Sequence, residues 1–296
     1  MHLGAPPGIA LLVVLLTSSG CGRQVQAAMT IEFASEDGVL QARGALQGEL
    51  PQGLWTHFHP GGGKHSEGNY EHGQRTGLWR SWRTDGTLAR TENYALGKLS
   101  GPVETFAAAG RPESLAQYAS DLRHGLFQEW NSQGTLRTQG QYEQGQRTGL
   151  WRFFHDNGQL TSEGTFLADQ RDGLWRDWYE NGQPRRAGPW KAGFPQGHWI
   201  DWYPNGQPQS DGFFAAGVKD GAWSTWLESG QLEAKVTYLH EKLEGAGVRY
   251  WPNGNKQWEG YFRANQRVGT WSVWHEDGQL DDAESGEYLA GVRQSK

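Results

Sequence analysis

The chain has 296 residues, a formal net charge of −6 and a mean hydropathy of −0.75. Low hydropathy is typical of disordered chains, but 16 Trp argue against disorder here, because each buried ring removes a large apolar area from water. Lys and Arg are scattered, which excludes the clustered cations on which nucleic-acid binding depends. No segment reaches the roughly 18 apolar residues of a membrane-spanning helix.

Residues 1–20 are predicted to be a signal peptide. The run IALLVVLL at 9–16 is a short apolar core, and small residues follow it up to Cys21, the only cysteine of the chain. This segment resembles a bacterial lipoprotein signal, in which the cysteine is acylated and becomes the mature N-terminus. The resemblance implies lipidation at Cys21, a tether over 21–28, and an exported protein of the outer membrane or periplasm. Ser18 and the uncharged start depart from the pattern, so ordinary signal cleavage stays an alternative.

The remainder of the chain repeats every 24 residues. Two glycine series keep this period without insertion, the second nine residues after the first. Such regularity indicates tandem structural units that bury their apolar surface against one another. The first series, counted below as repeat position 1, is Gly53, Gly77, Gly101, Gly125, Gly149, Gly173, Gly197, Gly221, Gly245 and Gly269. The second, at position 10, is Gly62, Gly86, Gly110, Gly134, Gly158, Gly182, Gly206, Gly230, Gly254 and Gly278.

Each repeat is predicted to form a β-hairpin of two strands of about six residues. The turn signal is Asn-Gly, which favours a type I′ turn because both residues tolerate positive φ. A second turn near Ala192-Gly193 leads to the next repeat. Gly at this density argues against helices. The expected fold is therefore all-β: an elongated meander or solenoid of about ten hairpins. The clearest turn glycines are Gly158, Gly182, Gly206 and Gly254.

Aromatic residues keep the same register and form ladders. Position 6 is aromatic in all ten repeats, position 18 in nine, and position 3 is Trp in seven. Trp175 and Trp178 lie three apart, so either both sheet faces carry aromatics or a bulge re-aims one of them. The glycine at position 16, for example Gly188, is expected to make room for a neighbouring ring. The tryptophans of the predicted structural ladder at position 6 are Trp82, Trp130, Trp178, Trp202, Trp226 and Trp274.

The unit G-x-W-x-x-W/F-Y-x-N-G-Q…E-G-x-Y/F…G resembles the MORN-repeat variant family of bacterial proteins. The resemblance covers roughly residues 53–291, and the predicted organisation is ten such repeats over 53–292. Gly38 and Gly44 keep the register, which indicates a degenerate capping repeat over 29–52. Some related proteins act as the antitoxin of a toxin–antitoxin pair, so the resemblance implies an antitoxin-like partner of a toxin as one alternative function.

Few residues suggest chemistry. His57 and His59 lie two residues apart on one predicted strand, so they would share a face and could hold a metal. His65 and His72 are nearby in the sequence, but no carboxylate or Cys completes a site. The run GGGKH at 61–65 lacks the glycine spacing of a phosphate loop and is interpreted as a turn. No catalytic motif stands apart from the repeat. The sequence therefore predicts a protein that is not an enzyme and has no cofactor and no metal.

Two classes of function remain besides the antitoxin alternative. The first is a scaffold on the cell envelope that binds a partner protein through an extended sheet surface. The second is a module that binds glycan or cell wall through an exposed aromatic ladder. The residues between the rings vary among repeats, for example Arg176-Asp177 against Ser224-Thr225, which suits partner selection. A protein partner is favoured, with the membrane contacted through the lipid anchor and no nucleic acid bound.

Overall fold

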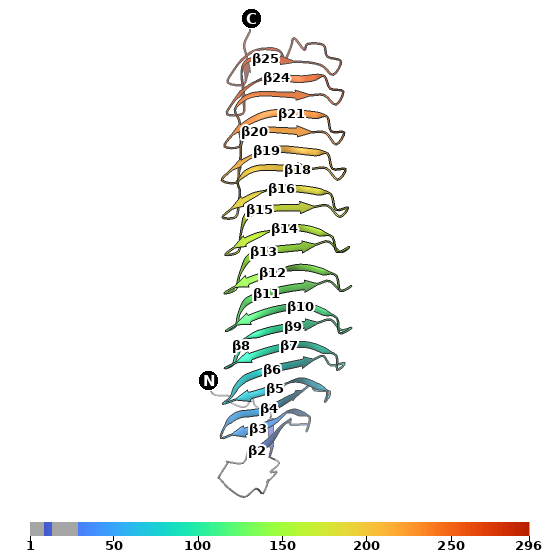
Figure 1. Ribbon diagram of the computed structural model, residues 1–296, viewed down its shortest axis with the longest axis vertical. Helices are drawn as coiled ribbons and strands as arrows, with labels where there is room; N and C mark the ends of the chain where they lie inside the picture. Colours follow the sequence, from blue (N-terminus) through green and yellow to red (C-terminus); the bar gives the residue numbers. More distant parts are fainter. Residues whose placement is uncertain (1–8, 14–28, 296) are drawn as a thin grey trace. The chain divides into compact units, whose positions relative to one another are not determined.

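The computed structural model describes residues 9–13 and 29–295, in which every regular element is a β-strand (Figure 1). The chain divides into two compact units, residues 1–146 and 147–296. Within each unit, successive strands pair antiparallel, so each unit is a meander of hairpins. The predicted all-β fold of repeated hairpins is confirmed.

Unit 1 begins with a strand from the predicted signal peptide. β1 pairs antiparallel with β2, from Ile9 opposite Ser35 to Val13 opposite Ile31. Cys21 and the rest of the predicted tether lie outside the described residues. The strands are β1 (Ile9–Val13), β2 (Met29–Ser35), β3 (Leu40–Gln47), β4 (Leu50–Phe58), β5 (Lys64–Glu71), β6 (Gln74–Trp82), β7 (Leu88–Ala95), β8 (Lys98–Leu99), β9 (Gly101–Phe106), β10 (Pro112–Ala119), β11 (Leu122–Trp130) and β12 (Leu136–Glu143).

Unit 2 repeats the same hairpin to the end of the described chain. Its last full-length strand, β25, pairs with the four-residue β26, which in turn pairs with β27. The strands are β13 (Gln146–Phe154), β14 (Leu160–Leu167), β15 (Gln170–Trp178), β16 (Pro184–Lys191), β17 (Phe194–Pro195), β18 (Gly197–Trp202), β19 (Pro208–Ala215), β20 (Val218–Trp226), β21 (Leu232–Leu239), β22 (Lys242–Leu243), β23 (Gly245–Tyr250), β24 (Lys256–Arg263), β25 (Gln266–Val273), β26 (Gly286–Leu289) and β27 (Val292–Arg293).

The glycine at position 1 lies inside a strand in seven of the ten repeats and begins β9, β18 and β23 in the other three. Most strands have eight or nine residues, longer than the predicted six, and those of nine residues continue through this glycine. Gly173 in β15 has a φ of 76°, and opposite it the register of β14 shifts between Glu163 and Thr165. A left-handed residue within a strand requires Gly and produces a bulge. The first glycine series therefore marks this bulge, and all ten of its members have positive φ.

The Asn-Gly turn is not of type I′. Gly182 has a φ of 82°, but Asn181 is not among the residues with positive φ. The amide of Gly182 donates to the Tyr179 carbonyl at 2.9 Å, and the amide of Tyr179 donates to the Gln183 carbonyl at 2.9 Å. This is a type I turn followed by a left-handed glycine, the usual three-residue hairpin loop. The prediction that both turn residues adopt positive φ is therefore wrong, and only the glycine needs it.

Asn181 instead connects neighbouring hairpins. Its Oδ1 accepts a hydrogen bond from the amide of Gln183 at 3.0 Å, which closes its own turn. Its Nδ2 donates to the carbonyl of Pro204, in the next turn, at 2.9 Å. Asn157, Asn205 and Asn253 make the same two bonds. An amide is the side chain suited to both tasks, because it offers an acceptor and donors together.

The type I′ turn lies at the other end of the hairpin. Ala192 and Gly193 have φ angles of 49° and 82°, which is the two-residue mirror-image turn. The amide of Gly193 also donates to the carbonyl of Arg171 in the preceding hairpin, at 3.0 Å. Other repeats place Ala, His, Leu, Ser or Gln at the position of Ala192, all with positive φ. Turns at both ends of the hairpins therefore carry hydrogen bonds between successive repeats.

The core consists of the tryptophans at position 3. Trp175 is 2% exposed, and the side chains that cover it come mainly from the preceding strand and turn. Phe166 meets the ring edge-on at 5.0 Å between centroids, and the guanidinium of Arg171 lies 4.1 Å from the ring centroid. The indole Nε1 donates to the Thr165 carbonyl at 3.0 Å, so the polar atom is satisfied. The face that carries Trp55, Trp79, Trp151, Trp175, Trp199, Trp223 and Trp271 is called the tryptophan face below.

Six of these seven rings lie against the glycine at position 16 of the preceding repeat, which leaves room for them. A Cβ on Gly164 would lie 2.2 Å from the Trp175 ring, and one on Gly188 would lie 2.2 Å from the Trp199 ring. The ring therefore lies directly on the glycine backbone of the neighbouring strand. The expectation that this glycine makes room for a neighbouring ring is confirmed. The further pairs are Gly44 with Trp55, Gly68 with Trp79, Gly212 with Trp223 and Gly260 with Trp271.

Where the glycine is replaced, the tryptophan of the next repeat is replaced too. Val236 takes the glycine position before Gly247, and Ala116 takes it before Phe127. At Gly247 the ring of Trp258 fills the space, with its nearest atom 3.1 Å from where a Cβ would lie. A side chain at position 16 and a tryptophan at the next position 3 therefore exclude each other in this chain. The third exception is Glu92, which precedes Val103.

Replacing Gly68 with Ala should lower the free energy of unfolding by about 1–3 kcal/mol, the usual range for overpacking. The added methyl would lie 2.3 Å from the Trp79 ring and would displace it. Gly63→Ala, just before the same strand, is the matched control, because a Cβ there meets nothing within 4 Å and its φ is not positive. Urea titrations followed by tryptophan fluorescence measure both variants. Equal midpoints for the two would contradict the steric argument.

Candidate functional site

Aromatic side chains occupy both faces of the sheet. Trp175 lies on the tryptophan face, whereas Trp178, three residues later, lies on the opposite face. The pairing of β15 with β16 shifts by one residue just before Trp178, since Asp177 pairs with Arg186 but Trp178 pairs with Pro184. The extra residue belongs to β16, so β15 itself keeps its alternation. Of the two alternatives left open by the sequence, aromatics on both faces is the correct one.

The position 6 rings form a band with the residues that pair with them at position 12. The rings are half-buried, unlike the tryptophans of position 3, so the ladder containing Trp178 is not the core. This set is called the aromatic band. In unit 1 it comprises Phe58, Trp82, Phe106 and Trp130 with Lys64, Leu88, Pro112 and Leu136. In unit 2 it comprises Phe154, Trp178, Trp202, Trp226, Tyr250 and Trp274 with Leu160, Pro184, Pro208, Leu232, Lys256 and Leu280.

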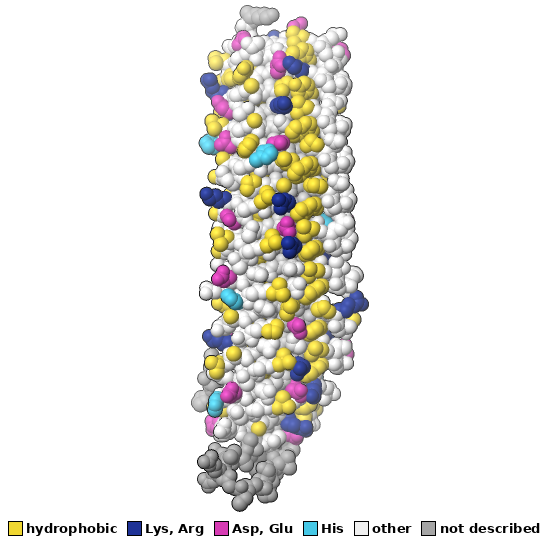
Figure 2. Space-filling model, viewed as in Figure 1, with side chains coloured by type: hydrophobic (Ala, Val, Ile, Leu, Met, Phe, Trp, Pro, Cys, Tyr) yellow, Lys and Arg dark blue, Asp and Glu magenta, His cyan; other side chains and the backbone are white. Residues whose placement is uncertain are grey.

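Contacts of one lysine show how the band is built. The Nζ of Lys256 lies 5.6 Å from the ring centroid of Trp274, one repeat further on, and 2.5 Å from the Glu259 carboxylate. The hydrogen bond with Glu259 raises the pKa of Lys256. Lys64 in unit 1 likewise lies 5.7 Å from the ring centroid of Trp82, so both lysines of the band reach over the ring of the next repeat. Within each unit, Figure 2 shows hydrophobic side chains gathered in such a stripe on one face.

Charged and polar side chains lie beside the band at positions 4 and 15. The Nε of Arg152 is 2.8 Å from the Glu163 carboxylate, and His198 Nε2, at position 2, is 2.6 Å from Asp211. In unit 1 the hydrogen bond from Lys64 lowers the pKa of Glu67. Positively and negatively charged groups alternate beside the stripe in Figure 2. The residues at positions 4 and 15 change from repeat to repeat, whereas position 6 of the band is aromatic in every repeat.

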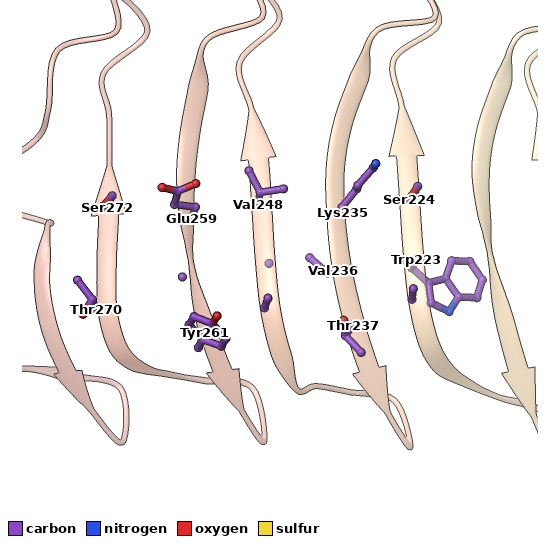
Figure 3. A pocket seen from close by; sticks show the side chains of 14 residues that line it. Trp223, Ser224, Lys235, Val236, Thr237, Val248, Glu259, Tyr261, Thr270 and Ser272 are labelled. Carbon is purple, nitrogen blue, oxygen red and sulfur yellow. The ribbon is translucent and has the colours of Figure 1, made fainter.

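Unit 2 also contains a shallow trough, across β20, β21, β23, β24 and β25. It lies on the face opposite the tryptophan face, which is the face that carries the aromatic band. Its volume is about 520 Å³. Figure 3 shows two rows of side chains along it: one contains Ser224, Lys235, Val248, Glu259 and Ser272, and the other contains Thr237, Tyr261 and Thr270. The backbone of the central strands forms the floor, because Ala222, Ala246 and Gly247 carry little or no side chain there.

The histidines of the first repeat have structural contacts. The ring of His57 lies on the tryptophan face between Trp55 and Trp79, with centroids 6.2 and 6.0 Å away. His59 instead bonds through Nε2 to the carbonyl of Trp82 at 2.9 Å. His72 lies in the type I′ turn. In residues 9–13 and 29–295 no three metal-ligating side chains gather.

His59 belongs to a ladder that sequence reasoning missed. Position 7 side chains bond to the carbonyl of the next position 6 residue, as the Tyr179 hydroxyl does to Trp202 at 2.7 Å and the Tyr203 hydroxyl to Trp226 at 2.8 Å. The cations at position 23 were also missed, although Arg171 and its equivalents cover the core rings. Both sets recur every 24 residues, so the period was the available signal. The GGGKH run is a turn, as predicted, with Gly62 at a φ of 86°.

Four consecutive segments of unit 2 match the family model described as MORN repeat variant: residues 147–168, 171–192, 195–216 and 219–240. Each begins at position 23, which is a cation in three of the four (Arg147, Arg171 and Lys219) and Pro195 in the other, and each ends within the type I′ turn. The predicted resemblance is confirmed for these repeats. Among curated proteins, none matches the sequence. A crystal structure of TcdB2-TccC3 without its hypervariable C-terminal region is similar at 10% identity with a TM-score of 0.19, over 94% of this chain and 18% of that one.

No helix in the described part of the chain has the length and hydropathy needed to span a membrane. The structure brings together the residues of the predicted position 6 ladder as one band within each unit. It places the turn glycines Gly158, Gly182, Gly206 and Gly254 in equivalent left-handed positions. The most distinctive exposed features of the described residues are therefore the aromatic band, its charged flank and the trough.

The stability of unit 1 should fall as the pH is lowered through 6.5, because of His57. Burial, then the charges of Arg75 and His65, lower the pKa of His57 below its ordinary value of 6.5. The unfolded chain then binds this proton more readily than the folded protein, so the free energy of unfolding decreases on acidification. His57→Phe, which copies Phe153 at the same position, should weaken this dependence. Urea midpoints at about pH 5 and about pH 8 test it, with His59→Tyr as the variant expected to retain it.

Proposed function

We propose that the protein is a non-enzymatic scaffold of the cell envelope that binds a partner protein through the face opposite the tryptophan face. The aromatic band carries this proposal. Rings are not needed there for the core, which the position 3 tryptophans already supply, yet position 6 is aromatic in every repeat. Half-exposed Trp and Tyr are the side chains most often found at the energetic centre of protein interfaces.

The flank of the band supports a protein partner. An interface commonly has an apolar centre and a polar rim, and the band has a rim of charged and hydroxyl side chains at positions 4 and 15. Because the band repeats with each hairpin, it suits an extended or multivalent partner that makes many similar contacts. The side chains that vary, such as Arg176, Ile200 and Ser224, face the same side and would select the partner.

A glycan is the second candidate, and the exposure of the band favours it. Half-exposed rings could stack on sugars, and Gln side chains at position 11 follow the band along the turns. Gln183 lies beside Gly206 of the next turn, with its Oε1 3.3 Å from where a Cβ would be. Amides beside rings are suited to sugar hydroxyls. The aliphatic groups between successive rings, such as Pro184, fit a continuous protein interface better than separate sugar platforms.

Site-specific photo-crosslinking in the native envelope tests the proposal. A photoreactive phenylalanine at Leu150 or Leu174, which are 45% and 46% exposed on the opposite face, should trap the same protein. The same probe at Ala192, exposed in a type I′ turn, should trap none of it. Trp178→Ser combined with Trp202→Ser should abolish the crosslink while the circular dichroism stays that of the folded protein.

The opposite result would favour the glycan. If no common protein is trapped from Leu150 and Leu174, and the purified protein is retarded by polysaccharide in affinity electrophoresis, the scaffold proposal fails. Retardation that is lost in the Trp178→Ser, Trp202→Ser variant would place the glycan on the band. Leu96→Ser is the matched control for both measurements, since it changes an exposed leucine in a type I′ turn, away from the band, where Ser120 already holds the equivalent position.

Envelope attachment through Cys21 is part of the proposal. Its support is the short apolar run followed by Ser19, Gly20 and Cys21. Cleavage after Gly20 would remove β1 and leave β2 as the edge strand of unit 1. Cys21→Ser should move the protein from the membrane fraction to the soluble periplasmic fraction, measured by fractionation and immunoblotting. A variant that stays with the membrane would show that the anchor is not a lipid on Cys21.

A further inference from the structure

The trough exists because the repeat departs from its own pattern there. Position 2 lies on the opposite face and holds the exposed residues Leu150 and Leu174 in the first repeats of unit 2. In two later repeats the same position holds Ala222 and Ala246. Two successive small residues lower the surface to the level of the backbone across neighbouring strands. A surface that breaks a repeat locally is where one special arrangement of unlike groups can form.

The floor of the trough offers no backbone partners to a ligand. Ala222 and Ala246 belong to β20 and β23, which are paired with strands on both sides. Their backbone amides and carbonyls are therefore used within the sheet. A peptide that binds by adding a strand needs a free edge, which this part of the sheet lacks. Recognition must come from side chains, which project from the floor in the two rows of Figure 3.

Most of these side chains are hydroxyls. Ser224, Ser272 and Thr237 supply aliphatic hydroxyls, and Tyr261 supplies a phenol on a side chain that is 58% exposed. Lys235 and Glu259 add one ammonium and one carboxylate, on β21 and β24. A single cation is a weak site for a phosphate-rich ligand. The set instead combines many uncharged donors and acceptors with one exposed ring and a flat apolar floor.

We propose that this trough binds a short, uncharged saccharide. Each sugar ring carries hydroxyls that both donate and accept hydrogen bonds, which matches Ser224, Thr237 and Ser272, and it carries an apolar C–H face that can stack on Tyr261. Lys235 and Glu259, in the row that does not contain Tyr261, hydrogen-bond the sugar hydroxyls that point away from the floor. The trough borders the aromatic band and shares Ser224 and Glu259 with its polar flank, but it contains none of the band's rings, and its ligand goes beyond the proposed partner protein.

Filling the trough tests the proposal without disturbing the fold. Ala246→Leu restores the residue that Leu150 and Leu174 already carry at the same position, so the strand should tolerate it. Titrations of the full chain by calorimetry would use two uncharged probes, cellotetraose and the tetramer of N-acetylglucosamine. At least one probe should bind, and Ala246→Leu and Tyr261→Ala should each weaken that binding by about tenfold or more. Leu174→Ala, the matched change outside the trough, should leave it unaltered.

Three results would overturn the saccharide site. They are no binding of either probe at about millimolar concentration, binding that is unchanged in Ala246→Leu, and binding of tetraalanine in the trough with neither sugar bound. The crosslinks from Leu150 and Leu174 should persist in Ala246→Leu. The failure of this site and the failure of the partner-protein scaffold are therefore distinguishable, because the first is measured at Ala246 and the second at the aromatic band.

Discussion

The structure depends on the contact between a tryptophan ring and the glycine of the neighbouring strand. Trp175 lies flat on Gly164, donates from its indole nitrogen to the Thr165 carbonyl, and is covered by Arg171. A Trp buried in this way typically contributes about 3–5 kcal/mol when its loss is measured by replacement with Ala. Because the ring belongs to one hairpin and the glycine to the preceding one, this energy joins hairpins that would be unstable alone. All other features of the repeat are arranged around this contact.

Much of the fold followed from the period. The glycine and aromatic series predicted an all-β chain of hairpins in fixed register, and the glycine at position 16 was interpreted correctly as space for a ring. The physical reasons for the other glycines were not all predictable. Gly173 forms a bulge and Gly182 ends a type I turn, both with positive φ, and composition alone does not separate these roles. The Asn-Gly signal led to the wrong turn type, because Asn181 serves a bond to the next hairpin, which a single hairpin does not reveal.

The candidate site was less predictable than the fold. The aromatic ladders at positions 3 and 6 have similar composition, so the sequence did not show which one is buried. The deciding fact is the glycine partner: Trp175 has one and Trp178 does not. The joint replacement of Gly and Trp at Val236 and Gly247 was a signal present in the sequence that would have identified the core ladder. The trough depends on small residues at position 2, whose face becomes known only once the bulges are placed.

The contact also gives the repeat a direction. The groups nearest the Trp175 ring are Gly164, Thr165, Phe166 and Arg171, and all of them precede it in the chain. A hairpin that emerges during synthesis therefore finds its partners already made, and it does not wait for residues still to come. Loss of hairpins from the C-terminal end leaves every remaining ring with its support. Loss from the N-terminal end removes the surface on which the next tryptophan rests. Shortening such an array from its N-terminus therefore exposes a core ring, whereas shortening it from its C-terminus does not.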